Sequence, residues 1–137
     1  MIAIVKADFN QEITGPLLKG CVDYLKEQQA PFELWEVPGA VETVALSKKL
    51  MDTGSYKSII VLGAIVEGDT DHYEYVCNFV THGIATLSAS AHIPVVFGVL
   101  TTQTEELALE RALPERMNKG AEFAETALTM MGLFAKI

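Results

Sequence analysis

The chain has 137 residues, of which 50% are hydrophobic and 20% are charged, a composition typical of one folded domain spanning residues 1–137. Its formal net charge of −8 excludes nucleic acid and anionic membranes as expected partners, because binding them requires a basic surface. No apolar run approaches the ~20 residues of a membrane-spanning helix, and the short apolar start lacks the features of a signal peptide. We therefore expect a soluble, cytoplasmic protein.

Strand and helix patterns alternate along the chain. Short apolar runs predict strands at residues 2–5, 32–37, 58–66 and 95–100. Apolar residues at helical spacing predict helices from about 13, at 40–51, from about 72 to before Pro94, after 102, and at about 118–136. This alternation predicts an α/β fold with a parallel sheet, right-handed crossovers and helices on both faces. The run at 58–66 is the most apolar of the four, as expected of a strand covered on both sides.

Two expectations concern local structure in the helices. In the helix at 40–51, the residues predicted to face inward are Val41, Val44, Ala45 and Leu50. Thr102 and Glu105 fit a capping box, which predicts Thr102 as the N-cap of the following helix.

The chain has two cysteines, Cys21 and Cys77, and both fall on apolar helical positions. They do not form a CxxC pair. We therefore expect them to be buried small hydrophobic residues rather than a disulfide or a catalytic thiol.

Unusual residues follow three of the four predicted strands. These strand exits are Asp8-Phe9-Asn10, the stretch at 38–42 and the stretch at 68–72. In an open parallel sheet, ligands bind in the crevice beyond the carboxyl ends of the strands. The three exits should therefore meet at one edge and form a ligand site.

The third exit combines residues that could bind an anion with a residue that could transfer protons. An apolar strand leads into a turn that contains Gly68, Asp69 and Thr70, and a helix begins near His72. A glycine-bearing turn before a helix exposes backbone N–H groups to an anion such as phosphate, and the imidazole adds proton-transfer capacity beside it. The alternative is that Asp69, Thr70 or Asp71 only caps the helix, with His72 on its surface.

Other readings of the site residues also remain open. Asp69, Asp71, His72 and Glu74 could form a metal cluster, but a helix start satisfies carboxylates by itself, so we expect no metal. Phe9 could stack on a planar heterocycle or simply pack. Glu42 could bind ligand N–H groups or only compensate the helix dipole, and Arg111 and Lys119 could be ordinary surface cations.

Five motifs, in order along nearly the whole chain, resemble the 6,7-dimethyl-8-ribityllumazine synthase family. They are FNQEIT, VPGAVE, LGAIVEGDTDHYEYV, PVVFGVLTT and ERA…NKGAEFA. The resemblance implies a flavodoxin-like, three-layer α/β/α sandwich with a four-stranded parallel sheet. It also implies a transferase of riboflavin biosynthesis that works without a cofactor. The substrates would be 5-amino-6-(D-ribitylamino)uracil and 3,4-dihydroxy-2-butanone 4-phosphate.

The resemblance also implies roles for individual residues. His72 would transfer protons, Phe9 would stack on the pyrimidine, and Asp69 and Thr70 would hold the phosphate. The pyrimidine and ribityl pocket would be lined by Ala40, Val41, Glu42, Ala64, Ile65 and Val66. Arg111 and Phe97 would come from a neighbouring subunit, with Lys119 near the same region. The protein would then be a homo-oligomer built on pentamers, with sites at subunit interfaces.

Two departures from the family pattern favour a rival function. Asp8 stands where the family usually has arginine, and Val41 stands where an aromatic residue is common. A non-catalytic paralogue that binds flavin or lumazine, or only forms an assembly, would tolerate both changes. The joint presence of four residues favours the enzyme, because assembly alone needs none of them: His72, Glu42, Thr70 and Arg111.

Overall fold

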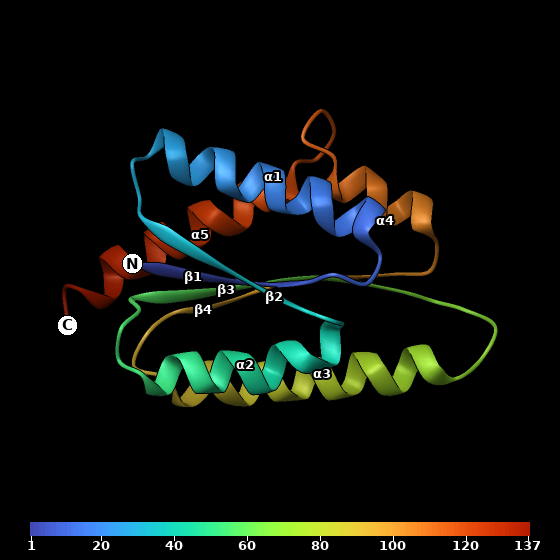
Figure 1. The fold of residues 1–137 in the computed structure, drawn as a ribbon, viewed down its shortest axis with the longest axis horizontal. Coiled ribbons are helices and arrows are strands. Elements are labelled where there is room, and N and C mark those ends of the chain that lie inside the picture. The colour runs from blue at the N-terminus through green and yellow to red at the C-terminus, as the bar shows by residue number, and fades with distance from the viewer.

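Four parallel strands form the middle layer of the molecule, as the computed structural model of residues 1–137 shows (Figure 1). They are β1 (Ile2–Ala7), β2 (Phe32–Val37), β3 (Ser58–Val66) and β4 (Val95–Thr102). Their order across the sheet is β2-β1-β3-β4, so β1 and β3 are inner strands and β2 and β4 are edges. All carboxyl ends point the same way, which brings the strand exits to one side.

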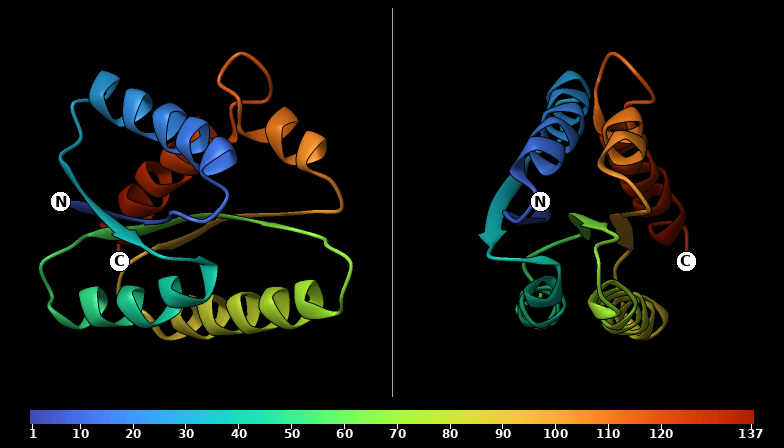
Figure 2. Two further views of the ribbon diagram at one scale, coloured as in Figure 1. Left: turned by 45° about the vertical axis from the view of Figure 1, so that its right-hand side comes forward. Right: turned by 90° about the vertical axis from the view of Figure 1, so that its right-hand side faces the viewer.

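Helices cover both faces of this sheet (Figure 2). One layer consists of α1 (Gln11–Glu27), α4 (Glu105–Ala112) and α5 (Lys119–Phe134). The other consists of α2 (Ala40–Asp52) and α3 (His72–Ser90). The expected three-layer, flavodoxin-like α/β/α sandwich with a four-stranded parallel sheet is therefore confirmed. No helix has both the length and the apolar character needed to cross a membrane.

The inner strands divide the hydrophobic core into two halves. Ile2 and Ile4 of β1 pack toward α1 and α5, whereas Ala3 and Val5 pack toward α2 and α3. Successive side chains of a strand point to opposite faces, so a strand covered by helices on both sides must be apolar at every position. This explains the unbroken apolar run of β3, which is buried from residue 58 to residue 65.

Helices α1 and α5 approach each other closely through two glycines. A Cβ atom on Gly120 would collide with the backbone oxygen of Leu17 and would lie only 2.9 Å from the nitrogen of Cys21. A Cβ atom on Gly20 would likewise collide with the side chain of Asn118. Only glycine fits at position 120, where the neighbouring atoms belong to the backbone of α1, whereas at position 20 the Asn118 side chain would have to move.

Three local expectations differ from the structure. β1 extends to Ala7, so Lys6 belongs to the strand and is buried. The N-cap of α4 is Thr104, whose side chain accepts from the Leu107 N–H, and the predicted cap Thr102 is wrong because it ends β4 paired to Val66. Ala45 is exposed, and Thr43 and Ser47 are buried on α2 instead.

Both cysteines are free thiols. Cys21 is fully buried in the core, as predicted, and burial raises its pKa to about 12. Cys77 is only half-buried, beside Tyr73 at the start of α3, and burial raises its pKa as well. Neither thiol is activated as a nucleophile, because the reactive form is the thiolate.

Candidate active site

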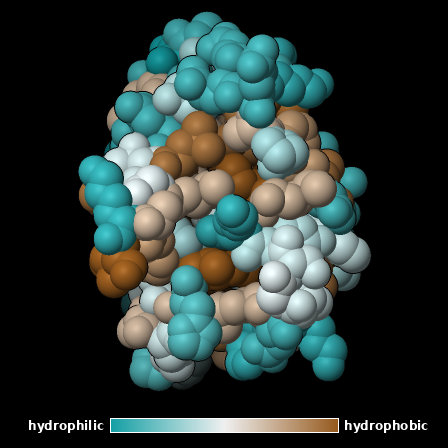
Figure 3. Space-filling model, turned by 90° about the vertical axis from the view of Figure 1, so that its left-hand side faces the viewer, coloured by the Kyte–Doolittle hydropathy of each residue, from teal (hydrophilic) through white to brown (hydrophobic).

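The largest group of predicted site residues lies at one end of the sheet, where the strands end. The face at the amino ends of the strands shows apolar groups scattered among hydrophilic ones (Figure 3). A cavity of 460 Å³ opens at the carboxyl ends, a size in the usual range for small-molecule sites. It is lined by Phe9, Asn10, Gly39, Ala40, Val41, Glu42, Ala64, Ile65, Val66, Gly68, Thr70, His72, Tyr73 and Val76.

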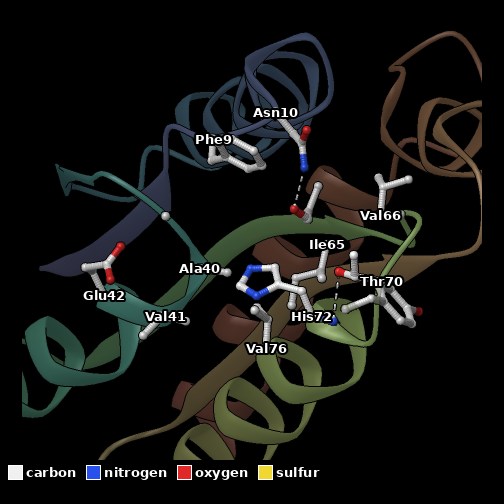
Figure 4. A pocket seen from close by; sticks show the side chains of 14 residues that line it. Phe9, Asn10, Ala40, Val41, Glu42, Ile65, Val66, Thr70, His72 and Val76 are labelled. Atoms are coloured by element: carbon white, nitrogen blue, oxygen red, sulfur yellow. Dashed lines mark hydrogen bonds between the residues drawn. The ribbon is translucent and has the colours of Figure 1, made fainter.

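The cavity brings the three strand exits together (Figure 4). The exit of β1 contributes Phe9 and Asn10, and the exit of β2 with the start of α2 contributes residues 39–42. The end of β3 and the start of α3 contribute the rest. The predicted site residues that line it are Phe9, Ala40, Val41, Glu42, Ala64, Ile65, Val66, Thr70 and His72. Their proposed roles toward a ligand stay predictions.

Phe9 forms one rim of the cavity. Its side chain is 70% exposed, so it is available to a ligand rather than packed in the core. The turn that carries it is held by the backbone, since the Phe9 N–H donates to the Pro38 oxygen at 3.0 Å. Asn10 adopts a left-handed conformation (φ 63°), and its Nδ2 donates to the Ala64 oxygen at 2.9 Å, which ties the turn to β3.

His72 is the first residue of α3, and its imidazole lies in the middle of the cavity beside Ala40 and Val76 (Figure 4). Its backbone N–H donates to the Thr70 Oγ1 atom at 3.3 Å. Asp71 occupies the N-cap position but makes no side-chain cap, so the capping alternative holds for Thr70 and not for Asp71. Thr70 thus shapes the turn that presents His72.

The remaining acidic residues of the turn do not enter the cavity. Asp69 is exposed and does not line it, although its neighbours Gly68 and Thr70 do. No group of three or more His, Cys, Asp or Glu side chains converges in a way that could hold a metal ion.

Five cavity residues were not predicted as site residues: Asn10, Gly39, Gly68, Tyr73 and Val76. Asn10, Gly39 and Gly68 were predicted only as parts of the strand exits, and Tyr73 and Val76 only as residues of the helix that begins near His72, where both also pack against the core. Val76 lies one helical turn after His72, so this spacing could have placed it beside the imidazole. Burial raises the pKa of Tyr73, so its hydroxyl stays neutral at physiological pH.

No lysine or arginine lines the cavity, and Glu42 is its only carboxylate. The predicted cations lie elsewhere in the same chain: Arg111 donates to the Leu107 oxygen at 2.9 Å, and Lys119 pairs with Glu122 at 3.2 Å. Phe97 lines a separate groove along the outer edge of β4. One chain therefore does not bring Phe97, Arg111 and Lys119 to His72.

An ion pair between a buried lysine and an exposed carboxylate lies just behind the rim. The Lys6 ammonium donates a hydrogen bond to Asp8 at 3.0 Å, and this bond holds the pKa of the Asp8 carboxyl below its usual value. As the pH falls, the Asp8 carboxyl of the unfolded chain therefore binds a proton at a higher pH than that of the folded chain. The stabilisation is therefore present above the unfolded pKa of about 3.9 and is lost as the pH falls through the folded pKa.

This pH dependence predicts the behaviour of Asp8→Asn. Between pH 6 and pH 3, the urea midpoint of the wild type should fall more steeply than that of the variant, because the variant has no carboxyl to protonate there. Urea unfolding followed by circular dichroism at several pH values measures this. If the urea midpoints of the two proteins fell equally with pH, the ion pair between Asp8 and Lys6 would make no contribution to stability.

One comparison with known proteins bears on this site. A family model described as 6,7-dimethyl-8-ribityllumazine synthase matches residues 1–135 of the chain, a range that includes every residue of the cavity.

Proposed function

The chain belongs to the 6,7-dimethyl-8-ribityllumazine synthase family, and on this premise we propose that it condenses 5-amino-6-(D-ribitylamino)uracil with 3,4-dihydroxy-2-butanone 4-phosphate. It would then be a transferase of riboflavin biosynthesis that uses no cofactor. The observation that carries the proposal is the single cavity in which Phe9, Glu42 and His72 meet from three different strand exits. A two-substrate condensation needs such a site, because the reacting groups must be held together and oriented.

The proposed chemistry begins with the 5-amino group of the pyrimidine. It attacks the butanone carbonyl, and loss of water gives a Schiff base. Phosphate is then eliminated, and the ribityl-bearing amine closes the second ring with loss of a further water. These steps move protons on and off nitrogen and oxygen, and His72 is the acid/base group in the middle of the cavity.

The pyrimidine would occupy the side of the cavity between β1 and α2. Phe9 offers an exposed aromatic ring for stacking, and Glu42 can accept hydrogen bonds from ring N–H groups. Ala40 and Val41, with Ala64, Ile65 and Val66 of β3, would complete the pyrimidine and ribityl pocket.

The phosphate would bind at the turn before α3. Gly68 and Thr70 line the cavity there, and Asp69 lies beside them on the exposed turn. The start of a helix favours an anion. The cavity has no cation of its own, which supports a site completed by Arg111, Phe97 and Lys119 from a neighbouring subunit. We therefore propose a pentamer-based homo-oligomer with sites at its interfaces.

Arg111→Ala should raise the KM for the phosphorylated butanone with little change in the KM for the pyrimidine. A charge-assisted contact contributes about 1.5–3 kcal/mol, which corresponds to a change of about tenfold or more. Steady-state kinetics with each substrate varied in turn measures this. Lys48→Ala is a matched control, because Lys48 is an exposed cation paired with Asp52 on α2. An unchanged KM for the phosphorylated substrate would make Arg111 a surface residue.

The activity itself is tested by mixing the purified protein with both substrates and following the fluorescence of the lumazine product. Formation of the product supports the proposal. Binding of the pyrimidine or of lumazine in a titration, without turnover, would instead identify a non-catalytic paralogue.

A further inference from the structure

Lys6 is the only charged residue that is buried, with 1% of its side chain exposed. It lies on the face of β1 from which Ile2 and Ile4 pack against α1. Its Nζ atom donates to Gln11 Oε1 at 2.6 Å, to Asp8 Oδ1 at 3.0 Å and to Glu36 Oε2 at 3.2 Å. An ammonium group has three hydrogens, so all of its donors are used.

These three acceptors surround the turn that carries the aromatic rim. Asp8 precedes Phe9 and Asn10, and Gln11 follows them as the first residue of α1. Glu36 belongs to β2, whose end accepts two backbone bonds from the same turn: Asp8 N–H to the Val37 oxygen at 2.8 Å and Phe9 N–H to the Pro38 oxygen at 3.0 Å. One buried cation therefore connects both ends of the turn to the strand that supports it.

Packing alone does not fix the Phe9 ring, because most of its surface is exposed. Its position depends on the backbone of the turn, which Lys6 holds from one side while Asn10 holds it from the other through Ala64. Stability gives no strong reason for the lysine, since the free-energy cost of removing its ammonium group from water can exceed the gain from its ion pairs with the half-exposed Asp8 and Glu36. A requirement for a fixed turn gives such a reason.

We propose that Lys6 is a positioning residue, which holds Phe9 and Asn10 at the rim of the cavity so that the pyrimidine substrate can stack. This inference rests on the proposed function. It assigns Lys6 no contact with substrate and no proton transfer, and its effect passes through the turn at 8–11.

The main test is Lys6→Met, because methionine is long and unbranched and has no charge. The KM for the pyrimidine should rise by about tenfold or more, because a small misplacement of a binding group is costly, and the KM for the butanone phosphate should change by less than about twofold. Ile4→Val is the matched control, since it removes one methylene from the same face of the same strand and should leave both KM values unchanged. An equal rise in both KM values, or no rise, would overturn the proposal.

A second readout does not depend on activity. Amide hydrogen exchange at Asp8 and Phe9 should become about tenfold faster in Lys6→Met and stay unchanged in Ile4→Val, because the turn opens locally when its charged bonds are lost. The wild type could form no lumazine while hydrogen exchange responds in this way. The proposed function would then be wrong, but the inference that Lys6 fixes the turn at 8–11 would stand. If exchange at Asp8 and Phe9 were unchanged in Lys6→Met, the inference that Lys6 fixes the turn would be wrong, whatever the activity of the variant.

A variant that keeps Lys6 covers the case in which Lys6→Met does not fold. Asp8→Ala removes one acceptor whose side chain is 52% exposed, so the fold should tolerate it. Exchange at Phe9 should rise in the same direction and by a smaller factor, and so should the KM for the pyrimidine. If the exchange rate at Phe9 and the KM for the pyrimidine both kept their wild-type values in Asp8→Ala, the proposal would be contradicted.

Discussion

Gly120→Ala should destabilise the protein by about 3 kcal/mol or more, a large share of the 5–15 kcal/mol that holds a typical domain folded. The added Cβ atom would collide with the backbone oxygen of Leu17 and would lie 3.0 Å from its carbonyl carbon. Both atoms belong to the backbone of α1, so no side chain can turn aside to relieve the clash. The helices must separate, and the core between them opens. Urea unfolding of the variant against the wild type measures the loss.

Gly132→Ala is the matched control for this prediction. It lies on the same helix, but a Cβ atom there would meet nothing within 4 Å. Alanine favours a helix over glycine by up to about 1 kcal/mol, so this variant should be as stable as the wild type or slightly more stable. Equal stabilities for the two variants would show that α1 and α5 do not pack as closely as described.

His72→Ala should lower kcat by about 10²–10⁴-fold without abolishing the reaction, because one acid/base group contributes about that factor. Binding and orientation by the rest of the cavity would remain. The variant keeps the backbone N–H of residue 72 that donates to the Thr70 Oγ1 atom, so the start of α3 should stay intact. Lumazine formation under saturating substrate measures kcat.

His82→Ala is the control for the histidine. It lies on α3 as well, but it is exposed and does not line the cavity. Its kcat should equal that of the wild type. Full activity in His72→Ala would remove the imidazole from the mechanism and leave the cavity as a binding site only.

The fold was predictable because the inner strands follow simple rules. β3 is apolar at every position after Ser58 and is covered on both faces, and its bounds match the predicted strand from Ser58 to Val66. The convergence of the strand exits followed from the topology alone, since parallel strands end on one side. The resemblance to the family agreed with both, and the match over residues 1–135 confirms it.

The incorrect predictions have a common physical cause: contacts with residues that are distant in the sequence outweigh local sequence patterns. The predicted strand stopped at residue 5, before Lys6, because a charged residue rarely lies inside a sheet, but three acceptors, including Glu36 of β2, satisfy the lysine there. Thr102 fits a capping box locally, yet pairing with Val66 keeps it in β4 and leaves the cap to Thr104. No pattern within a few residues contains this information.

Site residues show the same division. Phe9, Glu42 and His72 are unusual residues at strand exits, so the sequence singled them out, and the structure places all three at the cavity. Tyr73 and Val76 have ordinary core spacing and line the cavity only because α3 begins there. Whether Arg111 reaches a phosphate depends on a second copy of the chain, which the sequence of one copy does not position.

The contact between α1 and α5 has a consequence for biosynthesis. A ribosome makes α1 early and α5 last, so β1 to β4 can pair before α5 exists to cover the face from which Ile2 and Ile4 project. Until then the nascent chain exposes an apolar surface, which is the kind of surface that aggregates or binds chaperones. Completion of the fold therefore waits for the release of the last helix, and a chain that stops before residue 119 should aggregate when expressed.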